Sequence, residues 1–349
     1  MIAAAATEAK PADPRSPRPV AIWLLVCCAM IFAMVVIGGI TRLTCSGLSI
    51  TEWQPVTGIL PPLSATQWQG EFDKYQQTSQ YKLLNAGMSL ADFKTIYLWE
   101  YVHRLWGRLI GFVYALPFLY FLVRGRIPRR LAWPLAGIFM LGAAQGALGW
   151  YMVESGLADR IEVSQYRLTA HLALALLIYA ATLWAALGLL QAPSGEAPRW
   201  VRRASETVLC LVGLTIVAGG FVAGLNAGLT YNTFPLMGGK FVPAGYAQLQ
   251  PFIRNWFENI PAVQFDHRLL AETTVIAVML LWLAGRRAAL PHPARLALHA
   301  LALVTLLQLT LGISTLLFVV PIPLAAAHQA GAALLLTAAL VLRHRLRAA

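Results

Sequence analysis

Long apolar runs recur along nearly the whole sequence. A helix needs about 20 residues to cross the roughly 30 Å hydrocarbon core of a bilayer. Only 12% of the 349 residues are charged, against the roughly 25% usual in a soluble domain. The sequence therefore predicts an all-α integral membrane protein. Eight transmembrane helices are expected, two of them with charges near one end, at residues 20–40, 96–123, 131–153, 168–190, 207–225, 262–284, 296–320 and 324–342.

The net charge of +12 comes from basic clusters between the apolar runs. A nucleic-acid-binding module would carry such charge on one face of a soluble domain, so nucleic acid is excluded as a partner. Lys and Arg favour the cytoplasmic side of a membrane. The short segment after the second run carries Arg124, Arg126, Arg129 and Arg130, which predicts that both termini are cytoplasmic.

The first 19 residues are rich in Ala and Pro and lack the pattern of a mitochondrial transit peptide. We expect residues 1–19 to form a disordered cytoplasmic tail and the first span to be retained. A multi-pass protein of the bacterial plasma (inner) membrane is the predicted class.

The two halves of the chain share a weak internal repeat. Gly38-Gly39 and Ser46-Gly47-Leu48-Ser49 in the first half correspond to Gly219-Gly220 and Ala227-Gly228-Leu229-Thr230 in the second. An even number of spans per unit gives two four-helix bundles of the same orientation, a parallel repeat. The expected boundaries are an N-terminal bundle at 20–190 with a long outer loop at 41–95, a cytoplasmic linker at 191–203, and a C-terminal bundle at 204–345.

One histidine lies near the outer end of every second span, at His103, His171, His267 and His328. A lone intramembrane histidine is most often a hydrogen-bonding partner between helices. Four histidines at matching repeat positions and one expected depth favour a common role. Two imidazoles on facing helices can take both axial positions of a haem iron inside a four-helix bundle. We therefore expect one haem site in each bundle, near the outer (periplasmic) side.

Other uses of these histidines fit less well. A closed zinc site needs four nitrogen or sulfur ligands, and each half offers two histidines with no cysteine nearby. A proton relay would run through the bilayer rather than along one level.

The two candidate sites differ in one ionisable residue. Glu100 lies three residues before His103, whereas Gln264 lies three residues before His267. An acid here could steer the histidine, pass protons or bind a reaction intermediate, and the alternative is a simple pair with Arg104.

Small and basic residues beside the histidines also have two interpretations. Gly107 and Gly111 share a helical face with His103 and fit either helix packing or close approach of a porphyrin. Arg104, Arg108 and Arg268 fit either pairing with haem propionates or snorkelling to the interface.

The four cysteines predict no disulfide framework. Three lie within spans, and only Cys45 is expected in an outer loop.

The motifs around the first outer loop resemble a known family. The run Gly38-Gly39-Ile40-Thr41-Arg42-Leu43-Thr44, then Trp53-Gln54-Pro55-Val56-Thr57-Gly58 and Glu100-Tyr101-Val102-His103-Arg104, closely resembles the haem A synthase family in the form shared by alphaproteobacteria and mitochondria. The resemblance covers about residues 20–345. It includes 232–237, Asp266-His267-Arg268 and Ala327-His328-Gln329.

This resemblance implies an oxidoreductase that oxidises the C8 methyl group of haem O to the formyl group of haem A by two successive hydroxylations, for cytochrome c oxidase. It assigns a haem b cofactor to the C-terminal bundle, through His267 and His328 with Arg268 beside them. It assigns the substrate haem O to the N-terminal bundle, through His103 and His171. Glu100 matches the functionally important acid of the family.

One subgroup of the family carries two cysteines in the first outer loop, whereas this chain has Cys45 alone. A thiol or disulfide step is therefore not expected here. Implied partners are the haem O synthase, cytochrome oxidase assembly factors, an electron donor or acceptor, the lipid bilayer and a second copy of the chain. Activation of oxygen at the iron and trapping of an oxidised haem by water are both compatible with these residues.

Two other functions use the same features. A di-haem b membrane cytochrome that only transfers electrons would need the same four histidines, but replacing Glu100 would leave its function nearly intact. A transporter would share the parallel repeat, but the sequence lacks the broken-helix signal of such sites.

Overall fold

The structure is a computed structural model that describes residues 17–53, 58–157, 161–190 and 197–347. Residues 1–16 of the predicted tail at 1–19, and residues 191–196 of the predicted linker, lie outside the described residues, and α1 begins at Arg18 within the predicted tail. The prediction of eight spans is confirmed within the described ranges. The helices long and apolar enough to cross a membrane are α1 (Arg18–Leu43), α4 (Leu90–Val123), α5 (Arg129–Leu157), α6 (Gln165–Leu190), α7 (Arg199–Gly224), α9 (Ile260–Gly285), α10 (His292–Leu317) and α11 (Ile322–Arg345).

Every one of these helices begins before the apolar run that predicted it. Helix α4 begins six residues early because Ser89 caps it, its hydroxyl accepting from the backbone N–H of Asp92. Helix α10 ends at Leu317 rather than at 320, since Val319 and Val320 have positive φ values of 61° and 58°. Apolar composition predicts which residues cross the membrane, whereas capping decides where the helix starts.

The first outer loop is more structured than predicted. It contains α2 (Ala65–Gln76) and α3 (Ser79–Leu84), and Ser64 and Gln67 form a capping box at the start of α2. Phe72 and Tyr75 of α2 pack on Phe93 and Tyr97 of α4. This aromatic cluster attaches the loop to the part of α4 that precedes the predicted span.

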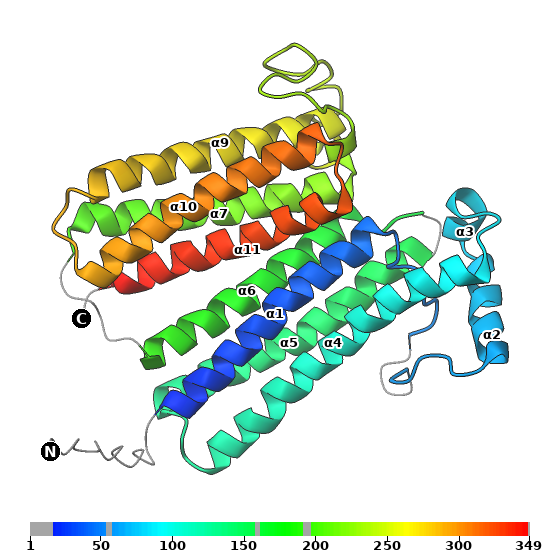
Figure 1. Cartoon of the computed structure of the whole chain (residues 1–349), viewed down its shortest axis with the longest axis horizontal. Coiled ribbons are helices and arrows are strands. Elements are labelled where there is room, and N and C mark those ends of the chain that lie inside the picture. Colours follow the sequence, from blue (N-terminus) through cyan, green and yellow to red (C-terminus); the bar gives the residue numbers. More distant parts are fainter. Residues whose placement is uncertain (1–16, 54–57, 158–160, 191–196, 348–349) are drawn as a thin grey trace, which may run out of the picture.

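The long helices pack in two groups of four. Helices α1, α4, α5 and α6 form one group, and α7, α9, α10 and α11 form the other; α1 and α6 meet α7 and α11 between the groups (Figure 1). Figure 1 also shows the described ends of the chain at one end of the molecule and the longest connections at the other.

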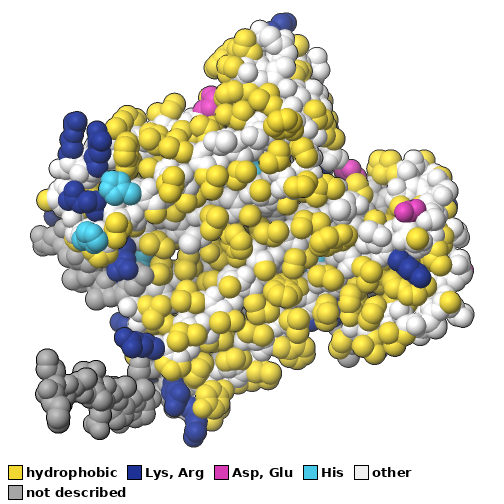
Figure 2. Space-filling model, viewed as in Figure 1, with side chains coloured by type: hydrophobic (Ala, Val, Ile, Leu, Met, Phe, Trp, Pro, Cys, Tyr) yellow, Lys and Arg dark blue, Asp and Glu magenta, His cyan; other side chains and the backbone are white. Residues whose placement is uncertain are grey.

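The surface agrees with a membrane setting. Apolar side chains cover the long faces of the helices, while Lys and Arg gather at the end that holds the α4–α5 and α9–α10 connections (Figure 2). Exposed side chains such as Met140, Leu214 and Leu303 lie near the middle of their helices. The chain is therefore a multi-pass membrane protein whose apolar faces contact lipid.

Candidate functional site

The structure brings the predicted histidines together in pairs. His103 of α4 lies near His171 of α6, and His267 of α9 lies near His328 of α11. Each pair lies within one group of four helices. His103 lies about four turns into α4, which starts as early as Leu90, whereas the other three histidines lie about two turns into their helices.

Each histidine ring is seated against a glycine of a neighbouring helix. A Cβ atom added to any of these glycines would lie 2.9–3.4 Å from the Cε1 atom of the ring, closer than or at the limit of ordinary contact. The pairs are Gly38 with His103, Gly149 with His171, Gly219 with His267, and Gly312 with His328. The same device at four positions fixes the orientation of every ring.

Two glutamines hold the helices that carry His171 and His328. Gln145 Nε2 donates to the carbonyl oxygen of His171 at 2.9 Å, and Gln308 Nε2 donates to that of His328 at 3.0 Å. Among the described residues, the Nδ1 atoms of His171 and His328 are buried and lack a hydrogen-bond partner. A buried polar atom without a partner is costly, so these imidazoles are suited to a ligand.

Open space lies beside the histidines of the first group. A Cβ atom at Gly111, Gly142 or Gly146 would meet nothing within 4 Å, and one at Gly107 would meet only Met34. Gly107 and Gly111 share a face of α4 with His103, and Gly142 and Gly146 share a face of α5 with Gly149. Helix packing does not account for Gly111. Glycine faces beside two imidazoles fit a flat macrocycle with two axial ligands.

Glu100 is buried, with 3% of its surface exposed, and is bonded through both carboxylate oxygens. Arg104 donates to Oε1 from Nε at 3.0 Å and from Nη2 at 2.6 Å. Ser49 Oγ and the Ile50 N–H each donate to Oε2 at 2.8 Å. The predicted pair with Arg104 is therefore present, and Glu100 also ties α4 to the start of the outer loop.

At the matching position in the second half, Gln264 donates a hydrogen bond to its loop, whereas Glu100 accepts hydrogen bonds from its loop. Gln264 Nε2 donates to the carbonyl oxygen of Ala227 at 2.8 Å. Arg268 donates to the carbonyl oxygens of Tyr231 and Thr233 at 2.6 and 2.8 Å, and to Gln264 Oε1 at 3.2 Å. The terminal nitrogens of Arg268 thus bind the second outer loop, while its Nε is buried without a partner among the described residues.

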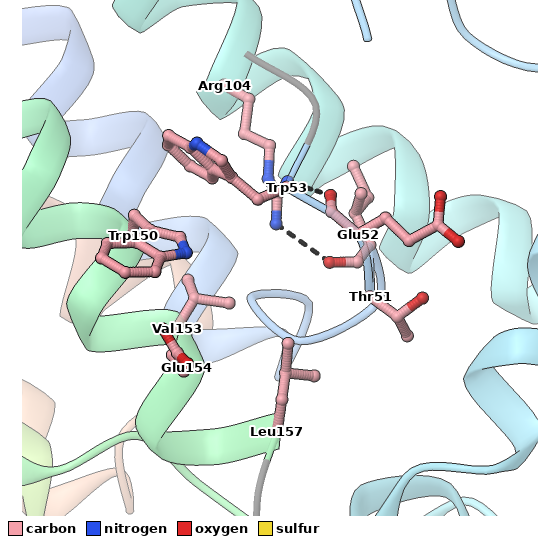
Figure 3. Close-up of a pocket in the computed structure, with 9 residues that line it drawn as sticks. Thr51, Glu52, Trp53, Arg104, Trp150, Val153, Glu154 and Leu157 are labelled. Carbon is pink, nitrogen blue, oxygen red and sulfur yellow. Dashed lines mark hydrogen bonds between the residues drawn. The ribbon is translucent and has the colours of Figure 1, made fainter.

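Two cavities adjoin Arg104 at the outer end of the first group. One, of about 380 Å³, lies between the outer loop and α5, where Arg104 lies 5.8 Å above the Trp53 ring and donates to the carbonyl oxygens of Ile50 and Glu52 (Figure 3). A second, of about 460 Å³, is lined by Tyr97, Tyr101, Arg108 and the start of α2. Residues 54–57 of the predicted motif lie outside the described residues; Trp53 and Gly58 on either side each line one cavity.

Sequence reasoning missed the residues of α5 that line the first cavity. Trp150, Val153 and Glu154 face Trp53 and Thr51 across it (Figure 3). They carry no motif, and only the packing of α5 beside the loop brings them to Arg104.

A polar cluster between the two groups was also missed. Arg42 donates to the carbonyl oxygen of Ala223 and to Asn226 Oδ1, and Asn226 Nδ2 donates to the two carboxylate oxygens of Glu162 at 2.7 and 2.9 Å. Cys45 and Asn226 occupy matching repeat positions, and both have positive φ, at 53° and 50°. The only sequence signal for Cys45 and Asn226 was that they occupy matching repeat positions just after α1 and α7.

Comparison with known proteins agrees with this arrangement. The family model described as "Cytochrome oxidase assembly protein" (COX15-CtaA) matches residues 21–340. A relative named "Heme A synthase" from Nitrosospira multiformis is 57% identical over 334 residues, which is 95% of this chain and 94% of the relative. One of the same name from Rhodospirillum centenum is 56% identical, covering 93% and 87%.

A eukaryotic relative, "Heme A synthase COX15" from Arabidopsis thaliana, is 48% identical over 96% of this chain and 76% of its own length. The similarity thus extends through both groups of helices and across bacteria and plants. The chain belongs to the COX15-CtaA family of cytochrome oxidase assembly proteins.

Proposed function

We propose that the chain is a haem A synthase, which oxidises the C8 methyl group of haem O to a formyl group in two successive hydroxylations. The observation that carries the proposal is the pair of glycine-seated histidines in each helix group, in a chain 57% identical over almost its full length to a protein named heme A synthase.

The two pairs take different roles in this proposal. His267 and His328 hold a haem b cofactor, which when bound supplies a one-electron redox centre. His103 and His171 hold the substrate haem O. The open space beside Gly111, Gly142 and Gly146 supports the N-terminal group as the substrate side, because haem O carries a large isoprenoid substituent that the site must admit.

Glu100 and the two arginines act at the outer ends of the sites. Glu100 holds Arg104 and the segment from Ser49 to Glu52 in place over the substrate side. Proton transfer by Glu100 requires it to exchange one of these bonds, and its partner Arg104 lines a neighbouring cavity together with Glu154. Arg268 fixes the second outer loop over the cofactor side.

The proposal includes the bacterial plasma membrane as the location, with both termini cytoplasmic and the histidines near the periplasmic side. The gathering of Lys and Arg at the end opposite the long loops supports this orientation (Figure 2). An electron partner, the haem O synthase, oxidase assembly factors and a second copy of the chain are the proposed partners.

The decisive experiment is chromatography with mass detection of haems extracted from membranes of a host that makes haem O but not haem A. With the chain expressed, haem A or its alcohol intermediate is expected. His103→Ala is expected to abolish both, while His292→Ala, which replaces a histidine at the cytoplasmic end, serves as the matched control.

The second candidate is a di-haem cytochrome that only transfers electrons. Glu100 is fully bonded to Arg104 and the loop, as expected of a structural residue, and a structural Glu100 favours this electron-transfer candidate. Unchanged haem O in the presence of a haem-loaded, expressed chain and a supplied electron partner would favour this candidate over the synthase.

A further inference from the structure

A half-buried polar side chain crosses between the two groups of helices beside both candidate haem sites. Gln329 of α11 directly follows His328, and its Nε2 donates to the carbonyl oxygen of Val35 on α1 at 2.7 Å. Helices α1 and α11 pack against each other along this contact. The bond therefore links the helix of a C-terminal histidine to the N-terminal group.

Gly39 forms the surface on which this side chain rests. A Cβ atom there would lie 2.5 Å from Gln329 Oε1 and 2.8 Å from its Cδ, distances that real Cβ atoms essentially never show. The preceding residue, Gly38, is the seat of the His103 ring. One short path thus runs from His328 through Gln329 to Gly39, Gly38 and His103.

The physical setting makes this path stiff. The bond joins two membrane-spanning helices, and hydrogen bonds between side chains and neighbouring helices contribute to helix association in membranes. Closely packed interiors transmit small displacements instead of absorbing them. A shift of His328 on binding a ligand therefore displaces Gln329, and the displacement reaches the glycine beneath His103.

The reciprocal contact is weaker. Thr169, two residues before His171, lies 3.0 Å from a Cβ atom added at Gly220, which follows the seat of His267. Its hydroxyl has no hydrogen-bond partner among the described residues. This contact is one of shape alone, whereas Gln329 adds a directed bond.

We propose that Gln329 is a positioning residue that couples the two haem sites, so that occupancy of one changes the binding properties of the other. The proposal rests on the assignment of a haem to each histidine pair. By linkage the effect is reciprocal: a haem b that alters affinity for the substrate porphyrin is altered by that porphyrin to the same degree.

The test uses the full chain, prepared with and without haem b, and a zinc porphyrin that carries the side chains of haem O. Zinc porphyrin is fluorescent and diamagnetic, so its fluorescence reports binding and the electron paramagnetic resonance spectrum reports haem b alone. In the unmodified chain we expect the dissociation constant to differ about fivefold or more between the two preparations, and the g values of haem b to shift on saturation.

Two variants disrupt the contact, one on α11 and one on α1. Gln329→Met keeps the volume but removes the donor, and Gly39→Ala displaces the amide of an intact Gln329. Each is expected to retain haem b and porphyrin binding, to bring the ratio of dissociation constants close to one, and to abolish the shift in g values. Gly137→Ala, whose Cβ would meet nothing within 4 Å, is the matched control and is expected to keep both.

The coupling is refuted if the unmodified chain shows equal constants and no shift, or if both variants keep the full effect. Failure of the proposed function looks different: the unmodified chain then binds no haem b at His267 and His328, or forms no haem A in the host assay. A chain that makes haem A with uncoupled sites overturns only the role of Gln329.

Discussion

The two halves of the chain hold their outer loops with matching arginines but with opposite polarity at one position. Arg104 binds the carbonyl oxygen of Ile50, and Arg268 binds that of Tyr231. Glu100 accepts hydrogen bonds from its loop, whereas Gln264 donates to its loop. A neutral amide is therefore sufficient to hold such a loop, which agrees with the proposed role of the Glu100 carboxyl in the reaction of the first half.

The halves also differ in how they fill the space beside the histidines. When Gln145 and Gly149 of α5 are aligned with Gln308 and Gly312 of α10, Gly142 corresponds to Thr305 and Gly146 to Leu309. Thr305 is buried, whereas the two glycines are exposed, and a Cβ atom added to either would meet nothing within 4 Å. The first half is thus open where the second is packed.

The largest expected effect separates the two histidine pairs. His328→Ala should reduce haem b in the purified chain by more than the roughly 10–100-fold that loss of a supporting residue costs at a metal site. His103→Ala should leave haem b in place and abolish haem A. Haem content and haem A yield, measured on the same preparations with His292→Ala as control, check this division. Equal loss of haem b in both variants would contradict it.

Replacing Glu100 with the amide found at position 264 tests whether the carboxyl is needed for the reaction. Glu100→Gln should lower haem A formation by about 10²–10⁴-fold, the usual contribution of a proton-transferring group, with haem b content unchanged. Yields within a few-fold of the unmodified chain would instead make Glu100 a loop anchor.

The reverse exchange should affect stability rather than chemistry. Gln264→Glu places a carboxylate against the carbonyl oxygens of Ala227 and Tyr231, where the amide now donates. We expect a loss of about 1–3 kcal/mol in stability, offset in part by Arg268. Loss of haem b absorbance on heating measures it, with the unmodified chain as reference.

Filling the open face should weaken substrate binding. Gly146→Leu introduces the side chain that Leu309 provides in the second half, and overpacking of about 1–3 kcal/mol corresponds to about 5- to 150-fold weaker binding. Titration with zinc porphyrin measures the change, and haem b content should stay constant. Gly137→Leu, on another face of α5, is the control; an equal effect there would point to general disruption of the helix.

The smallest effects concern Cys45 and its counterpart Asn226. Both have positive φ, a conformation that Asn tolerates better than Cys. Cys45→Asn should leave haem A yield unchanged and raise stability by up to about 1 kcal/mol. A large loss of activity would show instead that the thiol takes part in the reaction.

The pH dependence of alkylation offers a finer view of the same residue. Cys45 is exposed, but the protein around it partly desolvates the thiol and so raises its pKa, and the charge of Glu162 raises that pKa further. Because the thiolate is the reactive form, iodoacetamide should react with Cys45 more slowly at pH 8 than with a cysteine peptide, and the rate should rise at higher pH. The measurement uses a Cys210→Ala background, since Cys210 is also exposed.

Much of the fold follows from the sequence because lipid solvates apolar helices directly. The eight spans and the histidine pairs could be predicted from hydropathy and the repeat. Helix α2 of the outer loop could have been predicted from the capping box at Ser64 and Gln67, a local signal that apolar periodicity does not contain.

Contacts between distant segments could not be predicted in this way. Glu100 and Arg104 are four residues apart on one helix, so their pairing is visible in the sequence. Arg42 and Asn226 are 184 residues apart, and Gln329 and Val35 are 294 residues apart. Only the packing of α1 against the second group of helices brings these pairs together.

The matching arginine contacts bear on how such a chain can arise. Each half contains an even number of spans, so a tandem gene duplication inserts the second copy in the same orientation without any redistribution of its basic loops. The duplicated copy keeps a stable loop through Arg268 while its neighbour at position 264 is free to change. A single carboxylate-to-amide exchange, in either direction, is then enough to turn two equal units into an unequal pair.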